Sequence, residues 1–584
     1  MLGRLLLLIG VTVFSLSAKE RILVNRTGPA GSTLFTADAD GSQQRLLLGK
    51  SRFDYNPSFS TDGTWIVFTS ERNGSGDLYR VHADGSGLQQ LTNGPANDDQ
   101  GVLSPDGALL AFVSTRGSGS AHIWILTLKT GTMRQLTSGT GGDFRPTWSP
   151  DGTRIAFSSD RGHKVVHAEN RWEHLQEAEI YVCRASDGSD LHKLTPDRVF
   201  SGSPKWSPNG SRIVFYEMEI NYTLAARFIP ANELSQSVSL DVRTGARAVH
   251  TSGPGLKVSP QFLTEDRIGY VNKRGARPGL AYAGEDTIVT GPMLNPTWSP
   301  DGKHVAYQEY STESHVQNEP LLSLDPEFDI GYSSWFPAFS PDGRHLTVSS
   351  LIRPNQLKAA LSVMNSDGTN AKRIYYEEGM MALSPAWSPS GDWLVCGVGY
   401  FLSQRAKPTR LMMIRPDGTD ARELTKTPGN SGYPSWSPDG KSIVFRTWSE
   451  SERGLRILTV QNGAVSTLTT GYDNFPAWSP RGDVIAFMRL QDGDFDIFTI
   501  RPDGTGLKQL TRSPGNDSHP AWSPDSKRIL FSSSRLGFKD EAPLYDVPQP
   551  YGQLFIMNAD GTGQRPLTDN RWEEGTPAWQ PLIR

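Results

Sequence analysis

Apolar and polar residues alternate along most of the chain in short runs, which is the pattern of half-buried β-strands. The runs at 155–158 and 443–446 show this alternation clearly. Pro-Asp-Gly and Asp-Gly sequences separate the runs. They favour tight turns, because proline fixes φ and glycine accepts positive φ at low cost. The pattern therefore predicts an all-β chain of strands joined by hairpins.

One phrase recurs throughout: Pro-x-Trp-Ser-Pro-Asp-Gly, an apolar strand, a second strand, an Asp-Gly turn and Leu-Thr. The clearest copy begins at Pro146 and ends at Thr195. Intervals between copies run from 40 residues (Val258 to Trp298) to 58 residues (Trp148 to Trp206). This is the length of a four-stranded β-propeller blade, and the tryptophan is expected to pack between blades. The marker position of the twelve copies is occupied by Phe59, Leu103, Trp148, Trp206, Val258, Trp298, Phe339, Trp387, Trp436, Trp478, Trp522 and Trp579.

The spacing of the copies predicts two six-bladed rings. The interval from Phe59 to Trp298 is 239 residues, and that from Phe339 to Trp579 is 240 residues. The first ring is expected at 19–300, with its opening strands, including 21–24, completed by the Trp298 strand. The second is expected at 301–584, completed by the Trp579 strand. Such split blades leave no free sheet edge. The alternative is one ring of twelve blades, in which the Trp579 strand pairs with the N-terminal strands.

The repeat resembles the TolB-type propeller repeat of bacterial periplasmic proteins over nearly all of the expected mature chain. Ser-Ser-Asp-Arg at 158–161 and Ile-Met-Asn-Ala-Asp-Gly at 556–561 are similar to the phrasing of that family. The resemblance implies a propeller fold, a periplasmic location and envelope partners. TolB proteins place an α/β domain before a single six-bladed propeller and engage the Tol–Pal machinery. Here the repeats follow the expected leader directly and the blade number is doubled.

The first residues predict export. Arg4 precedes an apolar run from Leu5 to Phe14, and small residues follow at Ser15, Ser17 and Ala18, so residues 1–18 resemble a signal peptide. The alternatives are a buried strand or an uncleaved anchor. No later stretch approaches spanning length, so a periplasmic or secreted protein without a membrane span is expected. The net charge of −4 argues against a nucleic-acid surface.

The chain shows no convincing catalytic motif. Gly-x-Ser-x-Gly, His-Glu-x-x-His, paired Cys-x-x-Cys and a phosphate-binding loop are all missing from the sequence. The histidines at 163–174 share one segment, so they are expected to decorate a rim and no tightly held transition metal is predicted. Cys183 and Cys396 are expected to be buried free thiols. Binding is therefore favoured; the alternative is a propeller enzyme, a polysaccharide lyase or hydrolase acting in a central channel.

Acidic residues recur three positions before the strand proline, where the innermost strand of a blade begins. They are Asp54, Asp143, Asp473, Asp517 and Glu574. A ring of carboxylates at a channel mouth could hold calcium, for which Asp473, Asp517 and Glu574 are the candidates; otherwise each acid accepts backbone hydrogen bonds at a turn. No other cofactor is expected. Arginines recur after the second strand and could bridge to these acids or bind an anion: Arg72, Arg116, Arg161, Arg446 and Arg535.

The segment 536–551 is a long insertion rich in acids, tyrosines and prolines. Binding loops on rigid scaffolds have this character, and tyrosine is enriched where protein surfaces meet. The segment is therefore predicted to bind a partner, which would be a protein, an envelope component or a glycan; the alternative is a structural insertion. The predicted contact residues are Phe538, Asp540, Glu541, Tyr545, Asp546, Tyr551 and the nearby Trp572.

Overall fold

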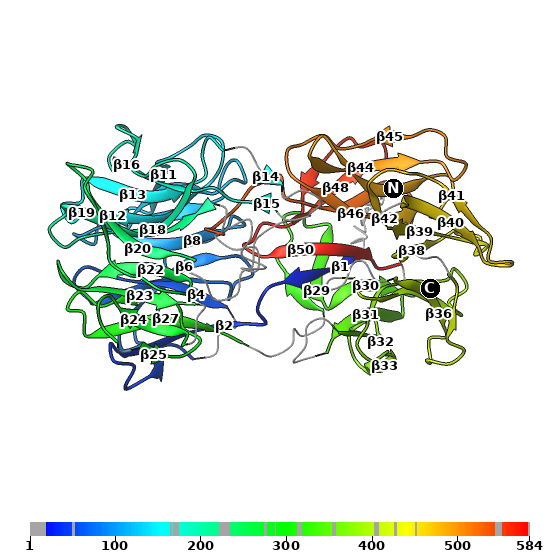
Figure 1. Ribbon diagram of the computed structural model, residues 1–584, viewed down its shortest axis with the longest axis horizontal. Coiled ribbons are helices and arrows are strands. Elements are labelled where there is room, and N and C mark those ends of the chain that lie inside the picture. The colour runs from blue at the N-terminus through cyan, green and yellow to red at the C-terminus, as the bar shows by residue number, and fades with distance from the viewer. Residues whose placement is uncertain are drawn as a thin grey trace, which may run out of the picture.

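The computed structural model describes residues 19–49, 53–163, 166–167, 174–220, 234–273, 277–286, 288–311, 318–352, 358–401, 408–425, 429–449, 452–542 and 552–581. The elements defined over these residues are all β-strands, and they form two rings that lie side by side (Figure 1). Each ring has six blades, so the predicted tandem six-bladed propeller fold is confirmed.

The first ring contains β2 to β27. Its six blades are separate four-stranded sheets in which most strands pair with their sequence neighbours. A separate two-stranded hairpin, β14 (Val166–His167) with β15 (His174–Leu175), lies in the third repeat unit. From the innermost strand outward, the blades are β4 (Asp54–Phe59), β5 (Trp65–Ser70), β6 (Asp77–His82), β7 (Gln89–Gln90); β8 (Asp98–Leu103), β9 (Leu109–Ser114), β10 (His122–Thr127), β11 (Thr132–Gln135); β12 (Asp143–Trp148), β13 (Arg154–Ser159), β16 (Glu179–Arg184), β17 (His192–Lys193); β18 (Val199–Trp206), β19 (Arg212–Glu219), β20 (Gln236–Asp241), β21 (Arg247–Val249); β22 (Lys257–Phe262), β23 (Ile268–Asn272), β24 (Gly279–Tyr282), β25 (Ile288–Thr290); and β26 (Leu294–Trp298), β27 (His304–Tyr310), β2 (Ser32–Asp38), β3 (Arg45–Leu46).

The second ring contains β1 together with β28 to β50. Two of its blades are joined into one sheet by a single bridge between Ala359 and Met381. From the innermost strand outward, its blades are β30 (Trp335–Phe339), β31 (His345–Leu351), β32 (Ala359–Asn365), β33 (Lys372–Tyr375); β34 (Met381–Trp387), β35 (Leu394–Gly399), β36 (Arg410–Ile414), β37 (Arg422–Glu423); β38 (Gly432–Trp436), β39 (Ser442–Trp448), β40 (Arg453–Thr459), β41 (Val465–Thr467); β42 (Asp473–Trp478), β43 (Ile485–Gln491), β44 (Asp494–Ile500), β45 (Lys508–Gln509); β46 (Asp517–Trp522), β47 (Arg528–Ser533), β48 (Gln553–Asn558), β49 (Arg565–Pro566); and β50 (Glu573–Trp579), β1 (Glu20–Thr27), β29 (Phe328–Ser333), β28 (Glu319–Leu321).

The strands that close the rings differ from the prediction. β1 lies between β50 and β29, antiparallel to the first and parallel to the second, so the 21–24 strand belongs to the second ring. β26 pairs with β27, which pairs with β2, so the first ring extends beyond residue 300. The boundaries expected at 19–300 and 301–584 are therefore corrected by one strand at each end. Alternation identifies a strand but not its partner, and β50 pairs with β1, which lies far from it in the sequence.

The two rings meet through the edges at which their innermost strands begin. Thr27, at the end of β1, lies opposite Glu573 at the start of β50, and five residues after Thr27 the residue Ser32 begins β2 in the first ring. In the same way the chain leaves the first ring after Tyr310 and enters the second at Glu319. The loops on these facing edges therefore come into contact.

The repeated phrase has a structural role in each blade. The indole nitrogen of Trp148 donates to the carbonyl of Val102 in the preceding blade at 3.0 Å, and Trp522 donates in the same way to Ala477 at 3.0 Å. In the turn, the Ser149 hydroxyl donates to Asp151 and accepts the Arg154 amide at 3.0 Å. The hydroxyl bond of Ser149 lowers the pKa of the Asp151 carboxyl. The tryptophans and turn aspartates therefore fix the blade geometry.

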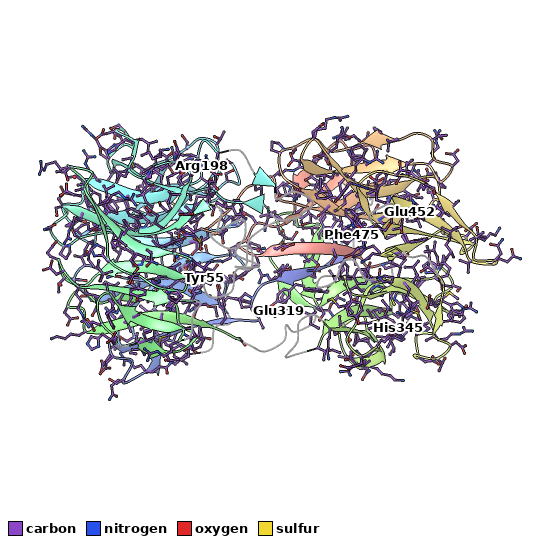
Figure 2. The ribbon with its side chains drawn as sticks, in the orientation of Figure 1. Tyr55, Arg198, Glu319, His345, Glu452 and Phe475 are labelled. Carbon is purple, nitrogen blue, oxygen red and sulfur yellow. The ribbon has the colours of Figure 1, made fainter. Side chains whose placement is uncertain are left out.

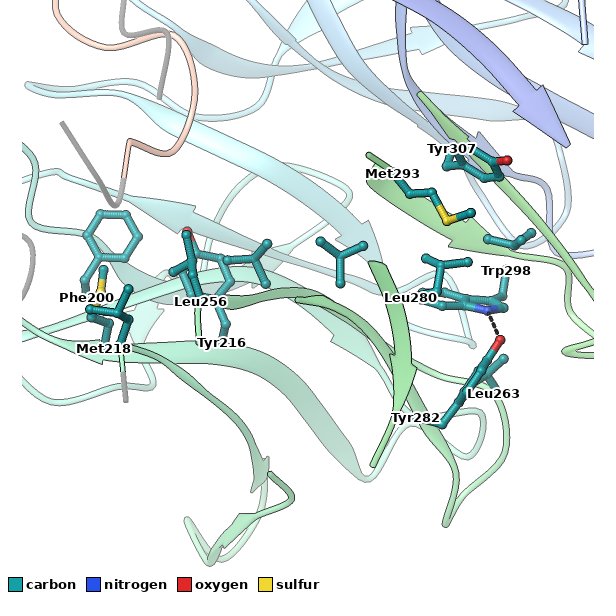
Figure 3. Close-up of a cluster of buried hydrophobic side chains, with 14 of the residues drawn as sticks. Phe200, Tyr216, Met218, Leu256, Leu263, Leu280, Tyr282, Met293, Trp298 and Tyr307 are labelled. Carbon is teal, nitrogen blue, oxygen red and sulfur yellow. Dashed lines mark hydrogen bonds between the residues drawn. The ribbon is translucent and has the colours of Figure 1, made fainter. Parts of the chain in front are cut away.

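The hydrophobic core is divided among the contacts between neighbouring blades. In the cluster of Figure 3, Phe200 and Tyr216 belong to one blade, Tyr282 to the next and Trp298 to the closing blade, where its indole donates to the Tyr282 hydroxyl at 3.3 Å. Cys183 and Cys396 are buried free thiols, as predicted, and burial raises the pKa of each to about 12. The leader expected at 1–18 lies outside the described residues, in which no helix is long and apolar enough to cross a bilayer.

Candidate ligand-binding site

Each innermost strand has one residue in the left-handed backbone region, where its side chain lines the channel of the ring. At these positions φ lies between 30° and 58°, and eleven of the twelve residues precede proline. The strand pairing slips there, as between Asn474 and Ala477 in β42, so each site is a β-bulge. Left-handed non-glycine residues cost about 1–3 kcal/mol each and cluster at functional sites. The residues are Asn56, Gln100, Arg145, Ser203, Ser259 and Asn295 in the first ring, and Phe336, Ser384, Tyr433, Phe475, His519 and Thr576 in the second.

In the second ring this arrangement opens into an aromatic cavity, here called the cup. The cup has a volume of about 310 Å³ and lies on the edge that faces the first ring. The rings of Tyr433 and Phe475 have centroids 4.2 Å apart, and Phe475 meets His519 edge to face at 4.1 Å. Figure 2 shows Phe475 within the second ring. The aromatic residues that line the cup are Trp335, Phe336, Phe401, Tyr433, Trp448, Tyr472, Phe475 and Phe495.

Polar groups are distributed among the aromatic rings of the cup. The Asn430 side-chain oxygen accepts from Thr409 at 2.7 Å and from Arg446, whose guanidinium lies 4.8 Å from the Tyr433 ring centroid. The Asn474 side-chain oxygen accepts the Phe475 amide at 3.0 Å. His519 is partly buried, and desolvation lowers its pKa to about 3, which favours the neutral imidazole. The cup therefore combines broad apolar faces with fixed amides.

The recurring acids at the channel mouths are paired with arginines. Asp473, a calcium candidate, accepts from Arg489 at 2.6 and 2.8 Å, and Asp517 accepts from Arg535 at 2.7 Å. Asp54 with Arg72 and Asp143 with Arg161 repeat the arrangement at 3.0 and 2.6 Å. The bridging role considered for Arg72, Arg161 and Arg535 is therefore confirmed. Arg446 instead contacts Asn430, and Arg116 pairs with Asp98.

The third calcium candidate, Glu574, is buried and accepts from Thr568 and Asn570. Desolvation raises its pKa, which disfavours the charged form that a cation would require. Within the described residues, no three His, Cys, Asp or Glu side chains form a group suited to a metal ion. The geometry of Asp473, Asp517 and Glu574 therefore favours a structural role, and the alternative that they bind calcium stays untested.

The described part of the insertion, up to residue 542, docks into the channel mouth of the first ring. Asp540 accepts from Arg145 and from Arg571, at 2.8 and 3.0 Å. Glu541 accepts from the Ser203 hydroxyl at 2.8 Å and the Tyr216 hydroxyl at 3.0 Å. Burial raises the pKa of Glu541, whereas for Asp540 desolvation is outweighed by Arg145 and Arg571, which hold its pKa below the usual range.

Trp572 and Arg571 make a second contact between the rings. The Trp572 indole donates to Glu71 at 2.7 Å and meets Tyr55 edge to face at 6.1 Å. Arg571 contacts Asp99 at 3.1 Å. Figure 2 shows Tyr55 on the side of the first ring that faces the second. Phe538, Asp540, Glu541 and Trp572 are thus buried by the first ring, which corrects the exposed partner surface expected for them. Tyr545, Asp546 and Tyr551 lie outside the described residues.

The left-handed residues of the channel were not predicted from the sequence, although the sequence contains a signal for them. The residue at this position is polar in every first-ring copy, whereas Phe336, Tyr433 and Phe475 occupy it in the second ring. In an alternating strand such residues resemble ordinary core positions. The bulge that turns them toward the channel is visible only once the strands are paired.

Comparison with known proteins agrees with this architecture. The sequence profile described as the TolB beta propeller domain matches residues 14–118, 284–474 and 398–549, which together are more than half of the chain. The chain is 34% identical over 246 residues to the "Protein TolB homolog" of Chlorobium luteolum, covering 42% of this chain and 51% of that protein. It is 31% identical over 107 residues to the "Tol-Pal system protein TolB" of Anaeromyxobacter dehalogenans strain 2CP-C, covering 18% of this chain and 24% of that protein.

Among solved structures, one from Agrobacterium tumefaciens named for TolB aligns with 48% of this chain and 99% of its own, with 20% identity and a TM-score of 0.37. The present chain matches about half the length of the Chlorobium relative. The family assignment therefore depends on the profile match and on the repeated phrase that builds each blade. The chain belongs to the TolB β-propeller family.

Proposed function

We propose that this protein is a periplasmic or secreted, non-catalytic binding protein that takes its ligand in the cup of the second ring. The observation that supports this most directly is the set of strained aromatic residues, Phe336, Tyr433 and Phe475, at the channel mouth. Ligand sites are commonly concave, mostly apolar and supplied with a few placed polar groups, and the cup has each of these properties. Its volume also lies at the lower end of the usual range for such sites.

The location is proposed from the apolar leader expected at 1–18 and from membership of the TolB family. Partners of the envelope, whether proteins or glycans, are consistent with that location.

Binding is proposed in preference to catalysis because of the state of two titratable groups that line the cup. Asp473 accepts hydrogen bonds from Nε and Nη2 of Arg489, and desolvation lowers the pKa of His519 to about 3, which favours the neutral imidazole. General acid–base catalysis needs a group that exchanges protons near the working pH and lies within reach of the substrate. A propeller lyase or hydrolase would need a group that exchanges protons in this way.

The test is a thermal-shift screen of envelope-derived fractions and pure compounds against the wild type and a double variant, Tyr433→Asn with Phe475→Asn. Asparagine occupies the same left-handed position at Asn56 and Asn295, so the change preserves the backbone while removing the aromatic faces. Tyr376→Ala, an aromatic change outside the cup lining, is the matched control. A ligand at 100 times its Kd adds about 2.7 kcal/mol of stability.

The proposal expects hits that stabilise the wild type and the control but not the double variant. Hits that stabilise all three proteins equally would place binding elsewhere and overturn the proposal. Fractionation of the cells that make the protein tests the location, and recovery of the full-length chain in the cytoplasm would contradict it.

A further inference from the structure

We infer that the ligand of the cup is a saccharide of roughly one or two pyranose rings, an inference that rests on the proposed function. The cup holds the volume of about ten liquid water molecules, which suits a ligand of this size. The choice of class depends on three features: the aromatic faces, the orientation of the amides and the balance of charge.

The aromatic side chains present faces in several directions. Trp448 and Tyr472 meet edge to face with centroids 4.3 Å apart, and Phe401 is tilted by 60° to Tyr433 at 5.6 Å. A pyranose ring has two faces rich in C–H groups, and these carry slight positive charge. They pack on the negative face of an aromatic ring. A cup with several non-parallel aromatic walls can therefore hold such a ligand from more than one side.

The amides of the cup are oriented as donors. The side-chain oxygens of Asn25, Asn430 and Asn474 accept from Thr576, Thr409 and the Phe475 amide, respectively. These bonds fix which end of each amide is the oxygen and leave the –NH₂ end as its donor. Hydroxyl, ring and acetamido oxygens of a saccharide accept such bonds. The three amides come from β1, from the position two residues before β38 and from β42, so they line the cup from different strands.

The charge balance separates the cup from the channel mouth of the first ring. There, Arg145 and the hydroxyls of Ser203 and Tyr216 bind the carboxylates of Asp540 and Glu541. In the cup, the carboxylate of Asp473 is paired with Arg489, and the lining residues Glu573 and Arg446 carry one formal charge of each sign, so the balance gives little attraction for an organic cation. The first ring is thus built for carboxylate side chains, and the cup for a ligand recognised by apolar faces and neutral oxygens.

Isothermal titration calorimetry with the full chain tests the inference. The probes are N,N′-diacetylchitobiose, cellobiose, maltose and digalacturonate, with the tripeptide Gly-Phe-Phe as the non-saccharide comparison. At least one of the saccharides is expected to bind, with affinity reduced at least about tenfold by Tyr433→Asn and by Asn474→Ala. The saccharide should also change the tryptophan fluorescence. Trp448→Phe should diminish this change, and Trp393→Phe, outside the cup lining, should not.

The outcomes separate this inference from the proposed function. If Gly-Phe-Phe binds with the same sensitivity to Tyr433→Asn while all four saccharides fail at millimolar concentration, the cup is a ligand site but the saccharide class is wrong. If saccharide binding is unaffected by both cup variants, the site is wrong. If cup variants alter the binding of none of the probes and of no screened compound, both proposals fail.

Discussion

Asp540 is the residue whose replacement should most directly weaken the contact between the rings. Its carboxylate is buried and accepts charge-assisted hydrogen bonds from Arg145 at 2.8 Å and Arg571 at 3.0 Å. Asp540→Asn keeps the shape and removes the charge, leaving the buried guanidinium of Arg571 and the partly buried one of Arg145 with a neutral acceptor. Charge-assisted bonds contribute about 1.5–3 kcal/mol each, and breaking a buried pair costs about 3–5 kcal/mol, so we expect a loss of about 3 kcal/mol.

The matched control is Glu285→Gln. Glu285 accepts from Arg267 at 2.8 Å, but their side chains are 40% and 43% exposed, so this loss should stay below about 1 kcal/mol. The measurements are denaturant unfolding and hydrogen exchange of the Ser203 amide, which donates to Glu541 and should exchange faster in Asp540→Asn. An Asp540→Asn protein no less stable than Glu285→Gln, with unchanged exchange at Ser203, would refute the docking described for this loop.

Three further predictions concern the carboxyl of Asp77, the indole of Trp522 and the metal content of the protein. Burial first, and the charge of Asp98 second, raise the pKa of Asp77 from 3.8 to about 7. The stability that Asp77 contributes is therefore fully present below about pH 4 and is lost as the pH rises toward about 7. Asp77→Asn should flatten the stability profile in that window, and an unchanged profile in urea titrations would contradict this. Trp522→Phe should cost about 1–2 kcal/mol through the lost bond to Ala477, and Trp522→Ala about 3–5 kcal/mol; a Trp522→Phe protein as stable as the wild type in unfolding experiments would show that the bond contributes nothing. Elemental analysis after dialysis should find no stoichiometric zinc or manganese, and calcium should not shift the Tm; bound metal would revive the lyase alternative.

The blade number could be predicted from the sequence because each repeat contains its own turn and strand signals. The Ser149–Asp151 turn and the Trp148 contact use residues within or next to one repeat. The partner of β1 could not be predicted in this way. Its strand pattern would fit either ring, and the pairing of Ile22 with Trp579 joins positions at opposite ends of the chain. Local propensity carries no information about such a pairing.

The candidate site was less predictable than the fold. The acids and arginines at the channel mouths repeat at fixed positions, so the Asp143–Arg161 bridge could be anticipated. The composition of the 536–551 insertion indicated a binding surface, but not that its partner is the first ring of the same chain. The cup depends on bulges that turn Tyr433 and Phe475 into the channel, and a bulge appears only when two strands are aligned.

Both rings have left-handed bulge residues along their channels, but these residues make different contacts in the two rings. The start of β50 connects the two sets of contacts. Arg571 is held by Asp99 of the first ring and by Asp540 of the docked loop. Two residues further along, Glu573 lines the cup, and Thr576 follows as the left-handed residue of that strand. β50 is paired with β1 in the closed ring, so the contacts that Arg571 makes lie two residues from this wall of the cup. The docked loop therefore joins the rings close to the cup.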